Sequence, residues 1–292
     1  MAVRHTPFDG SHPLFRIGLE PLDTAEWLEV DDQLDAYLDE KARLSALYPD
    51  HVFAAEAGTE EAQREVLDLL VAHLADRHRD THAFDGDTAR AGRHEVQLDS
   101  AAPPLVTAAR LVQEDLVLMR RGEEGWRIAA ASLSFPSSWS LIDKFGKVLN
   151  EVHRPVPGFA AGSRNAVVIE RIFDNLLVER PARRMNWSVY PDGELFHDSR
   201  IASNLAKRNF DGDLFLRVEH QTLRRLPASG DILFTIRIHM NPFAMLAAHA
   251  ERDRLCAGLI ALIERLSDAE LAYKGLKDGR ERLIGRIRAV MG

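Results

Sequence analysis

The chain has 292 residues, of which 46% are hydrophobic and 28% charged, and its formal net charge is -8 at pH 7. This composition is typical of a globular protein with a buried core and argues against non-specific nucleic-acid binding, because an acidic chain repels a polyanion. The single cysteine, Cys256, excludes an internal disulfide and an iron–sulfur cluster held by this chain alone.

The N-terminal part of the chain is predicted to be helical after an irregular start. Residues 1–22 contain several prolines and are expected to form an arm or a short strand. A capping signal at 23–26 opens a helix that continues to Tyr48, and a second helix is predicted over 59–78. The first ten residues, MAVRHTPFDG, contain no apolar signal segment and no stretch is long enough to cross a bilayer, so we expect a cytoplasmic protein without membrane contact.

Polar residues rich in Gly, Asp and His follow at 79–94 and are expected to form a loop. Three histidines, His73, His78 and His82, lie beside this segment. Their spacing is not a compact zinc signature, so we interpret them as surface histidines.

The middle of the chain is predicted to be rich in strands. A short helix at 103–112 precedes two alternating segments, 115–120 and 126–135, whose connection predicts a β-hairpin. An amphipathic helix then follows and is expected to end near His153, because the prolines after it disfavour helical backbone. Another helix is predicted over 165–177.

A further strand is predicted at 184–190, followed by a polar loop at 198–212 and a second hairpin formed by 214–223 and 232–239. The period of two along this hairpin places Arg217, Glu219 and Gln221 on one face, with His220 out of phase. Helices are predicted from 241 to about 290. Helices at 1–112, a β-rich part at 113–240 and helices at 241–292 together predict an α+β fold, which we interpret as a single domain.

His153 is the main candidate for chemistry, because a helix end followed by prolines fixes one imidazole in place. It is either a metal or haem-iron ligand, or a helix cap that bonds a terminal carbonyl. His197 and His220 are the alternative ligands. The chain has no glycine-rich phosphate loop, GxGxxG, GxSxG or HExxH motif, so the common catalytic signatures are missing.

Charged and aromatic residues offer two further candidate sets. The charged strand residues are either a solvated face or the wall of a pocket that binds carboxylates, since arginine forks suit carboxylates. The large aromatic residues either fill the core or line a flat cavity. The charged and polar set is Arg217, Glu219, Gln221, Arg224 and Arg225. The aromatic set is Phe135, Trp139 and Trp187.

Four segments resemble the haem-dependent oxidative N-demethylase alpha-subunit-like family. They are HPLFRIGLEPLDTAEWLEVDD, FPSSWSLIDKFGKVLNEVHRPVPGF, RMNWSVY and RVEHQTLRRLPASGDILFTIR, and the resemblance covers roughly residues 10–245. It implies a PAS-like core at 113–240 that binds haem b and oxidatively demethylates a small N-methylated amine with dioxygen, releasing formaldehyde. Electrons are then expected from a separate NADPH-dependent reductase that carries flavin and an iron–sulfur cluster.

The resemblance also implies roles for individual residues. His153 matches the histidine of the family's HxPVPG segment and is the expected iron ligand, while Arg224 and Arg184 are expected to neutralise haem propionates. Trp139 and Trp187 are expected at the haem, and Glu219 is expected to orient the cationic amine. His220 departs from the arginine expected between Glu219 and Gln221. The alternative is a PAS-like haem sensor or carrier without turnover.

Overall fold

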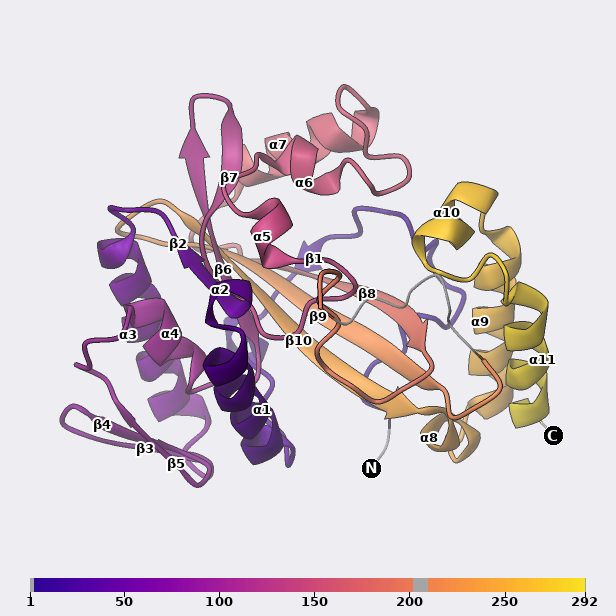
Figure 1. Ribbon diagram of the computed structural model, residues 1–292, viewed down its shortest axis with the longest axis horizontal. Helices are drawn as coiled ribbons and strands as arrows, with labels where there is room; N and C mark the ends of the chain where they lie inside the picture. Colours follow the sequence, from indigo (N-terminus) through magenta and orange to yellow (C-terminus); the bar gives the residue numbers. More distant parts are fainter. Residues whose placement is uncertain (1–2, 202–209, 292) are drawn as a thin grey trace.

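The computed structural model describes residues 3–201 and 210–291, and a seven-stranded antiparallel sheet lies at its centre (Figure 1). The order of the strands is β1-β8-β9-β10-β6-β7-β2. Their bounds are β1 Glu20–Pro21, β8 Ala182–Tyr190, β9 Phe215–Arg225, β10 Ile232–Pro242, β6 Asp115–Gly122, β7 Gly125–Ser132 and β2 Phe53–Ala55.

Both predicted hairpins are confirmed, as β6–β7 and β9–β10. The register of the second hairpin and its neighbour fixes the two faces of the sheet: Glu219 lies opposite Ile238 of β10 and opposite Asn186 of β8. Since side chains alternate along a strand, every second residue of β8, β9 and β10 shares the face of Glu219.

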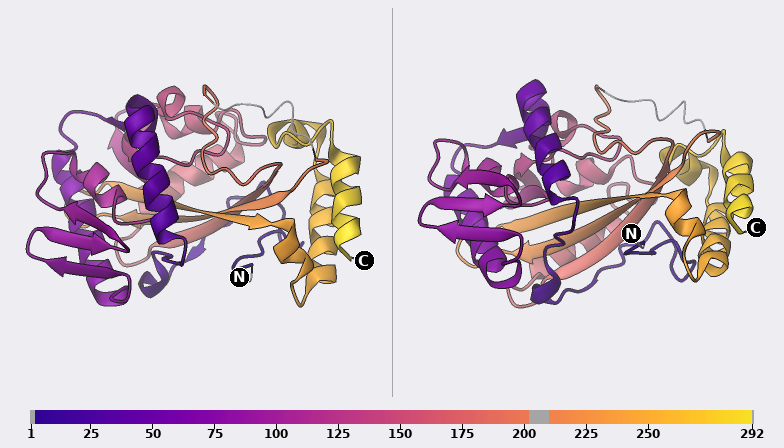
Figure 2. Two further views of the ribbon diagram at one scale, coloured as in Figure 1. Left: turned by 60° about the horizontal axis from the view of Figure 1, so that its bottom comes forward. Right: turned by 90° about the horizontal axis from the view of Figure 1, so that it is seen from below.

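Helices pack at both ends of the sheet and over one of its faces (Figures 1 and 2). One end carries the N-terminal helices and a small second sheet, and the other end carries the C-terminal helices. The first group is η1 Thr24–Glu26, α1 Leu34–Leu47, α2 Pro49–Val52, α3 Glu60–Arg77 and α4 Pro104–Ala109, and the second is α8 Phe243–Ala247, α9 Arg252–Arg265, α10 Asp268–Tyr273 and α11 Arg280–Met291. Each group buries an apolar cluster of its own against the sheet.

A third apolar cluster lies under the helices α5 Leu141–Lys144, α6 Leu149–His153 and α7 Arg164–Asn175. α7 begins with Ser163, whose hydroxyl accepts a hydrogen bond from the Ala166 N–H, and it buries Phe173 inward. These helices cover the sheet face that carries Glu219 and thereby form the roof of the site described below.

Four sequence-based expectations are wrong in detail. In place of a loop at 79–94, the chain forms a three-stranded sheet that continues to Gln97, with β3 His82–Asp85, β4 Thr88–Ala91 and β5 His94–Gln97, and its tight turns use Gly86 and Gly92 at positive φ. His82 is buried and its Nε2 donates to the Leu111 carbonyl at 2.8 Å, so it is not a surface histidine.

The first predicted helix begins only at α1, since 23–26 forms the 3-10 turn η1. The helix before His153 is divided into α5 and α6, with Gly146 at φ 73 between them, but its predicted end at His153 is confirmed. The predicted loop at 198–212 lies partly outside the described residues.

The α+β class is confirmed, whereas the PAS-like core and the single-domain boundaries stay predictions. Within the described ranges, none of the helices combines the length and apolar character needed to cross a bilayer.

Candidate functional site

A cavity of about 460 Å³ lies between the sheet and the helices α5–α7. Its volume is within the range of small-molecule and cofactor sites. The sheet supplies one wall, the helices supply the roof, and residues 14–19 of the N-terminal arm close another side. Most of the lining is apolar, and examples are Leu14, Ile17, Val117, Met119, Ile128, Val152, Phe159, Ile169, Phe173, Leu223, Phe234 and Ile236.

Polar side chains enter this cavity from alternate positions of β8 and β9. Arg184 and Asn186 come from β8, while Glu219 and Gln221 come from β9. The strand register pairs Arg184 with Gln221 and Asn186 with Glu219, so the four side chains form one polar patch in an otherwise apolar wall. A few converging polar groups in an apolar cavity are typical of a site that orients its ligand.

His153 enters the cavity from the roof at the last residue of α6. Its Nδ1 lies 2.9 Å from the Leu149 carbonyl oxygen and its ring stacks on Phe159 at 5.9 Å between centroids. A carbonyl oxygen can only accept a hydrogen bond, so Nδ1 carries the proton and Nε2 of the neutral ring keeps its lone pair. The ring therefore caps its own helix with one nitrogen and has a basic nitrogen left.

Electrostatics keep the His153 imidazole neutral. Burial lowers its pKa to about 4, the charges of Lys144 and Arg184 act in the same direction, and the Leu149 carbonyl opposes them in part. No hydrogen bond to His153 Nε2 is formed by any of the described residues. A neutral imidazole whose Nδ1–H is held by a backbone carbonyl is the usual state of a metal-ligating histidine.

Glu219 is a buried carboxylate in the polar patch and accepts a hydrogen bond from Gln221 Nε2 at 2.6 Å. Burial alone would raise its pKa, but the Ser137 and Asn186 hydrogen bonds and the charges of Arg217 and Lys274 lower it below the ordinary value. Glu219 is therefore ionised at neutral pH and offers a fixed negative charge in the cavity.

Arg217 holds the loop that contains Ser137. Its guanidinium is fully buried and donates to the Ser137 hydroxyl at 2.9 Å, the Phe135 carbonyl at 2.7 Å and the Leu195 carbonyl at 3.0 Å. Since the Ser137 hydroxyl accepts from Arg217, its own proton is directed at Glu219. Arg217 thus positions Glu219 through Ser137.

Two cations of the cavity have no carboxylate at ion-pair distance within the described ranges. Arg184 donates to Gln221 Oε1 at 3.2 Å and to the Arg16 carbonyl at 3.4 Å, and burial lowers its pKa. Lys144 lies with Nζ 4.3 Å from the Trp139 ring centroid, and burial lowers its pKa to about 8. Both cations feel the charge of Glu219, but neither forms an ion pair with it, and partly desolvated cations of this kind suit an anionic group on a ligand.

The structure brings together four of the six expected site residues: His153, Arg184, Trp139 and Glu219 all line the cavity. Arg224 and Trp187 do not, because they lie on the other face of the sheet. Arg224 stacks over Trp27 at 4.4 Å, and Trp187 packs against Phe8 at 6.4 Å.

The two alternative histidines also lie outside this cavity lining. His197 Nε2 lies 3.0 Å from the Glu194 carbonyl oxygen and 3.2 Å from Asp192 Oδ1. His220 is buried beside Glu29 on the far face of the sheet, in agreement with its predicted phase.

Sequence reasoning missed several lining residues that come from distant segments. Lys274 follows α10, and its Nζ donates to the Trp187 carbonyl at 2.7 Å and to Asn186 Oδ1 at 3.1 Å. Residues 14–19 of the arm reach the same cavity. No local pattern marks these residues, because only the tertiary fold brings them to the site. Lys144 carried a signal, since it lies five residues after Trp139 in the same segment.

Fold and site together define an α+β protein with a ligand cavity that holds a neutral histidine, an ionised glutamate and, among the described residues, two cations that form no ion pair with a carboxylate. The chain matches the family described as haem-dependent oxidative N-demethylase, alpha subunit-like, over residues 18–284 of 292, and it belongs to that family. At the level of the family this is a haem-dependent oxidoreductase.

The cavity residues fit a haem. An unprotonated imidazole nitrogen without a hydrogen bond would suit ligation of the iron, apolar walls would suit the porphyrin, and a cation without a carboxylate ion pair would suit a propionate. The fit rests on His153, Arg184 and the apolar lining of the described part of the chain.

The lowered pKa of His153 has a consequence for stability. An unfolded chain binds a proton at this histidine near pH 6.5, whereas the folded protein does so only near pH 4. Stability is therefore lost as the pH falls through this window. We therefore expect the free energy of unfolding, measured by urea titration, to decrease less between pH 7 and pH 5 in His153→Leu than in the wild type.

The matched control is His12→Leu, because His12 is exposed. It is expected to keep the pH dependence of the wild type. An identical loss of stability in His153→Leu and the wild type would show that His153 is protonated normally in the folded protein.

Proposed function

We propose that this chain is the haem-binding subunit of an oxidative demethylase that acts on a small N-methylated amine. Haem b is the proposed cofactor, dioxygen the oxidant and a separate reductase the electron source. The observation that carries the proposal is that a neutral histidine and an ionised glutamate face the same cavity in a member of this family.

His153 would hold the iron through Nε2, because the Leu149 carbonyl holds Nδ1–H and thereby fixes both tautomer and ring orientation. Arg184 is the proposed partner of a propionate. Trp139, with Lys144 over its ring, is proposed to form part of the haem wall. Arg224 and Trp187 are left out of this set because of their position on the other face.

Glu219 is the proposed amine site. A carboxylate that stays ionised while buried attracts a cationic amine strongly, because little water screens the charge. Gln221 and Ser137 keep the carboxylate in one orientation, so the N-methyl group of a bound amine would point in a defined direction. The apolar lining excludes water and favours the small hydrocarbon part of the substrate.

Haem, when bound, supplies the activation of dioxygen. In the overall reaction one oxygen atom leaves in formaldehyde and the other in water, while the amine loses its methyl group. Two electrons and two protons must enter for this balance. The one cysteine cannot hold an iron–sulfur cluster alone, so we propose that a reductase with flavin and an iron–sulfur cluster delivers NADPH electrons.

The role of Arg184 is tested by haem retention. We expect Arg184→Met to weaken haem binding by about 1.5–3 kcal/mol, or roughly 10- to 100-fold, because a charge-assisted hydrogen bond to a propionate is lost. The measurement is haem titration followed by absorption. Arg224→Met is the matched control, with unchanged affinity expected. Equal affinities for both variants and the wild type would remove Arg184 from the haem site.

The role of Glu219 is tested by turnover. We expect Glu219→Gln to bind haem normally but to lower kcat/KM for an N-methylated amine at least about 10-fold, because the loss of a buried charge partner costs 1.4 kcal/mol or more. Formaldehyde release with a surrogate reductase is the readout. Glu251→Gln, at an exposed glutamate of the C-terminal part, is the control.

The same assay separates the enzyme from a haem sensor. If the wild-type protein binds haem but releases no formaldehyde from a panel of small N-methylated amines, the demethylase proposal fails and the sensor or carrier remains. Unchanged turnover in Glu219→Gln would instead rule out Glu219 as the amine site.

A further inference from the structure

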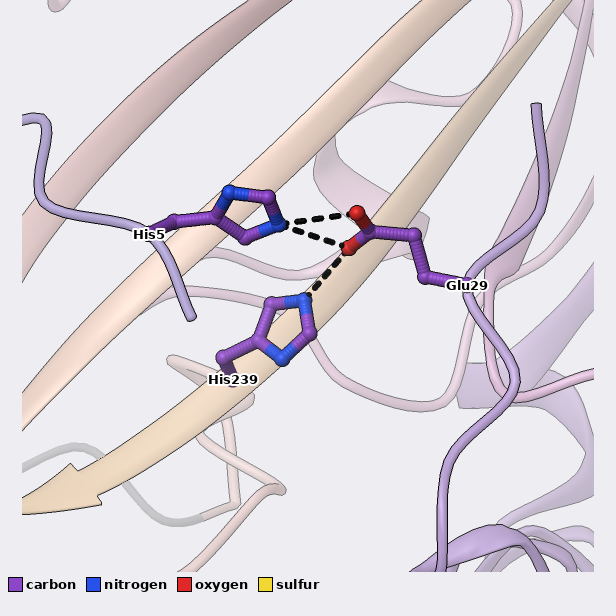
Figure 3. A group of neighbouring side chains, drawn as sticks. All are labelled: His5, Glu29 and His239. Atoms are coloured by element: carbon purple, nitrogen blue, oxygen red, sulfur yellow. Dashed lines mark hydrogen bonds and ion pairs between the residues drawn. The ribbon is translucent and has the colours of Figure 1, made fainter. Parts of the chain in front are cut away.

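A second cluster of titratable residues lies on the sheet face opposite the cavity (Figure 3). It joins His5 of the N-terminal arm, Glu29 of the segment before α1 and His239 of β10. Glu29 Oε1 lies 2.8 Å from His5 Nε2, and Glu29 Oε2 lies 2.7 Å from His239 Nε2. All three donor atoms lie within 4.8 Å of one another.

A third histidine, His220, lies beside the same carboxylate. His220 Nδ1 lies 3.5 Å from the same Glu29 Oε2, and its ring stacks on His5 at 5.5 Å between centroids. His220 Nε2 is buried, and none of the described residues forms a hydrogen bond with it. Three imidazoles therefore surround a single buried glutamate.

Burial and charge decide the protonation states. Burial lowers the pKa of His239 and lowers that of His220 to about 4, so both rings are neutral at pH 7. Burial alone would raise the pKa of Glu29, but its bonds to His239 and His5 outweigh this and lower it. Neutral imidazoles and an ionised carboxylate are the forms that bind a metal ion.

We propose that His5, Glu29 and His239 form a binding site for a divalent first-row transition metal ion, of which Zn²⁺ is the expected species. Two histidines and one carboxylate are a common zinc ligand set with an open fourth position. His220 Nδ1 lies close enough to take that position after a small movement. The nitrogen and oxygen donors disfavour Mg²⁺ and Ca²⁺, which prefer oxygen ligands alone.

Binding of the ion would replace the hydrogen bonds between the histidines and Glu29. Without metal, the Nε2 atoms of His5 and His239 lie at hydrogen-bond distance from the Glu29 carboxylate, whereas a metal ion needs the lone pair of each Nε2, with the ring proton on Nδ1. The hydrogen-bonded ligand atoms, now 2.7–2.8 Å apart, must separate by more than about half an ångström, because ligands at about 2.0–2.2 Å from a tetrahedral ion lie roughly 3.3–3.6 Å from one another. His5 comes from the arm and not from the sheet, and its side chain is 16% exposed, compared with 9% for His239.

Three positive groups lie near this place, namely Arg4, Arg183 and Arg237, and the guanidinium of Arg237 is paired with Asp31 at 2.7 Å. Arg4 Nε lies 3.5 Å from Glu29 Oε1, but its side chain is 50% exposed and can turn into solvent. The site is therefore open to solvent on the side of the arm and closed on the side of the sheet, where the His239 side chain is 9% exposed.

The ion would fasten the start of the arm to the sheet. The same arm supplies residues 14–19 of the cavity wall, so a metal at His5 limits the motion of a segment that closes the cavity. The inference does not depend on the haem proposal, because the two sites use different faces of the sheet and different histidines.

The test uses haem-free protein without an affinity tag, treated with a chelator and then titrated with Zn²⁺ in a calorimeter. We expect one ion per chain, and we expect His5→Ala to weaken binding at least about 10-fold, since the loss of even an outer-shell partner costs this much. His12→Ala, an exposed histidine of the same arm, is the matched control and is expected to bind as the wild type does.

A second readout keeps the test decisive if a variant folds poorly. At a 100-fold excess of Zn²⁺ over Kd, Tm of the wild type is expected to rise by about 5 °C, and hydrogen exchange of the arm is expected to slow. Glu29→Gln is expected to lose the rise in Tm. The proposal is overturned if the wild type binds no zinc, or if His5→Ala and Glu29→Gln bind it as tightly as the wild type.

Discussion

The alternation of side chains along paired strands β8 and β9 is the constraint on which both sites depend. Because Asn186 lies opposite Glu219 and Met185 opposite His220, one face receives Glu219 and Arg184 and the other receives His220. A shift of one residue in this register would exchange the two sets completely. The sheet thereby separates a cavity for an organic ligand from a histidine cluster, although Glu219 of the cavity and His220 of the cluster are adjacent in sequence.

Desolvation gives the cavity its chemical character. It keeps His153 neutral and leaves Arg184 and Lys144 as cations without a carboxylate partner in the described part of the chain. Glu219 remains charged only because Ser137, Gln221 and nearby cations stabilise it. The cavity therefore offers the neutral imidazole of His153, the carboxylate of Glu219 and the two cations Arg184 and Lys144. These groups suit a haem iron, a cationic amine and a haem propionate, respectively.

Much of this arrangement was accessible from the sequence, and the errors have physical causes. The hairpins, the end of the helix at His153 and the common face of Arg217, Glu219 and Gln221 follow from local patterns. The alternation of side chains along a strand also places Trp187 on the opposite face from Arg184, and Arg224 on the opposite face from Glu219. The wrong assignment of Trp187 and Arg224 to the haem site could therefore have been recognised from the sequence. The sheet at 82–97, Lys274 and the cluster around Glu29 could not, because tertiary contacts alone create them.

Direct observation of the iron ligand tests the central claim. Wild-type protein, His153→Ala and His197→Ala would each be reconstituted with haem, and absorption spectra would be recorded beside circular dichroism. The account predicts a native fold in all three, a changed haem spectrum only in His153→Ala, and partial recovery of that spectrum on addition of imidazole. A wild-type haem spectrum in folded His153→Ala would contradict the assignment of His153 as the axial ligand.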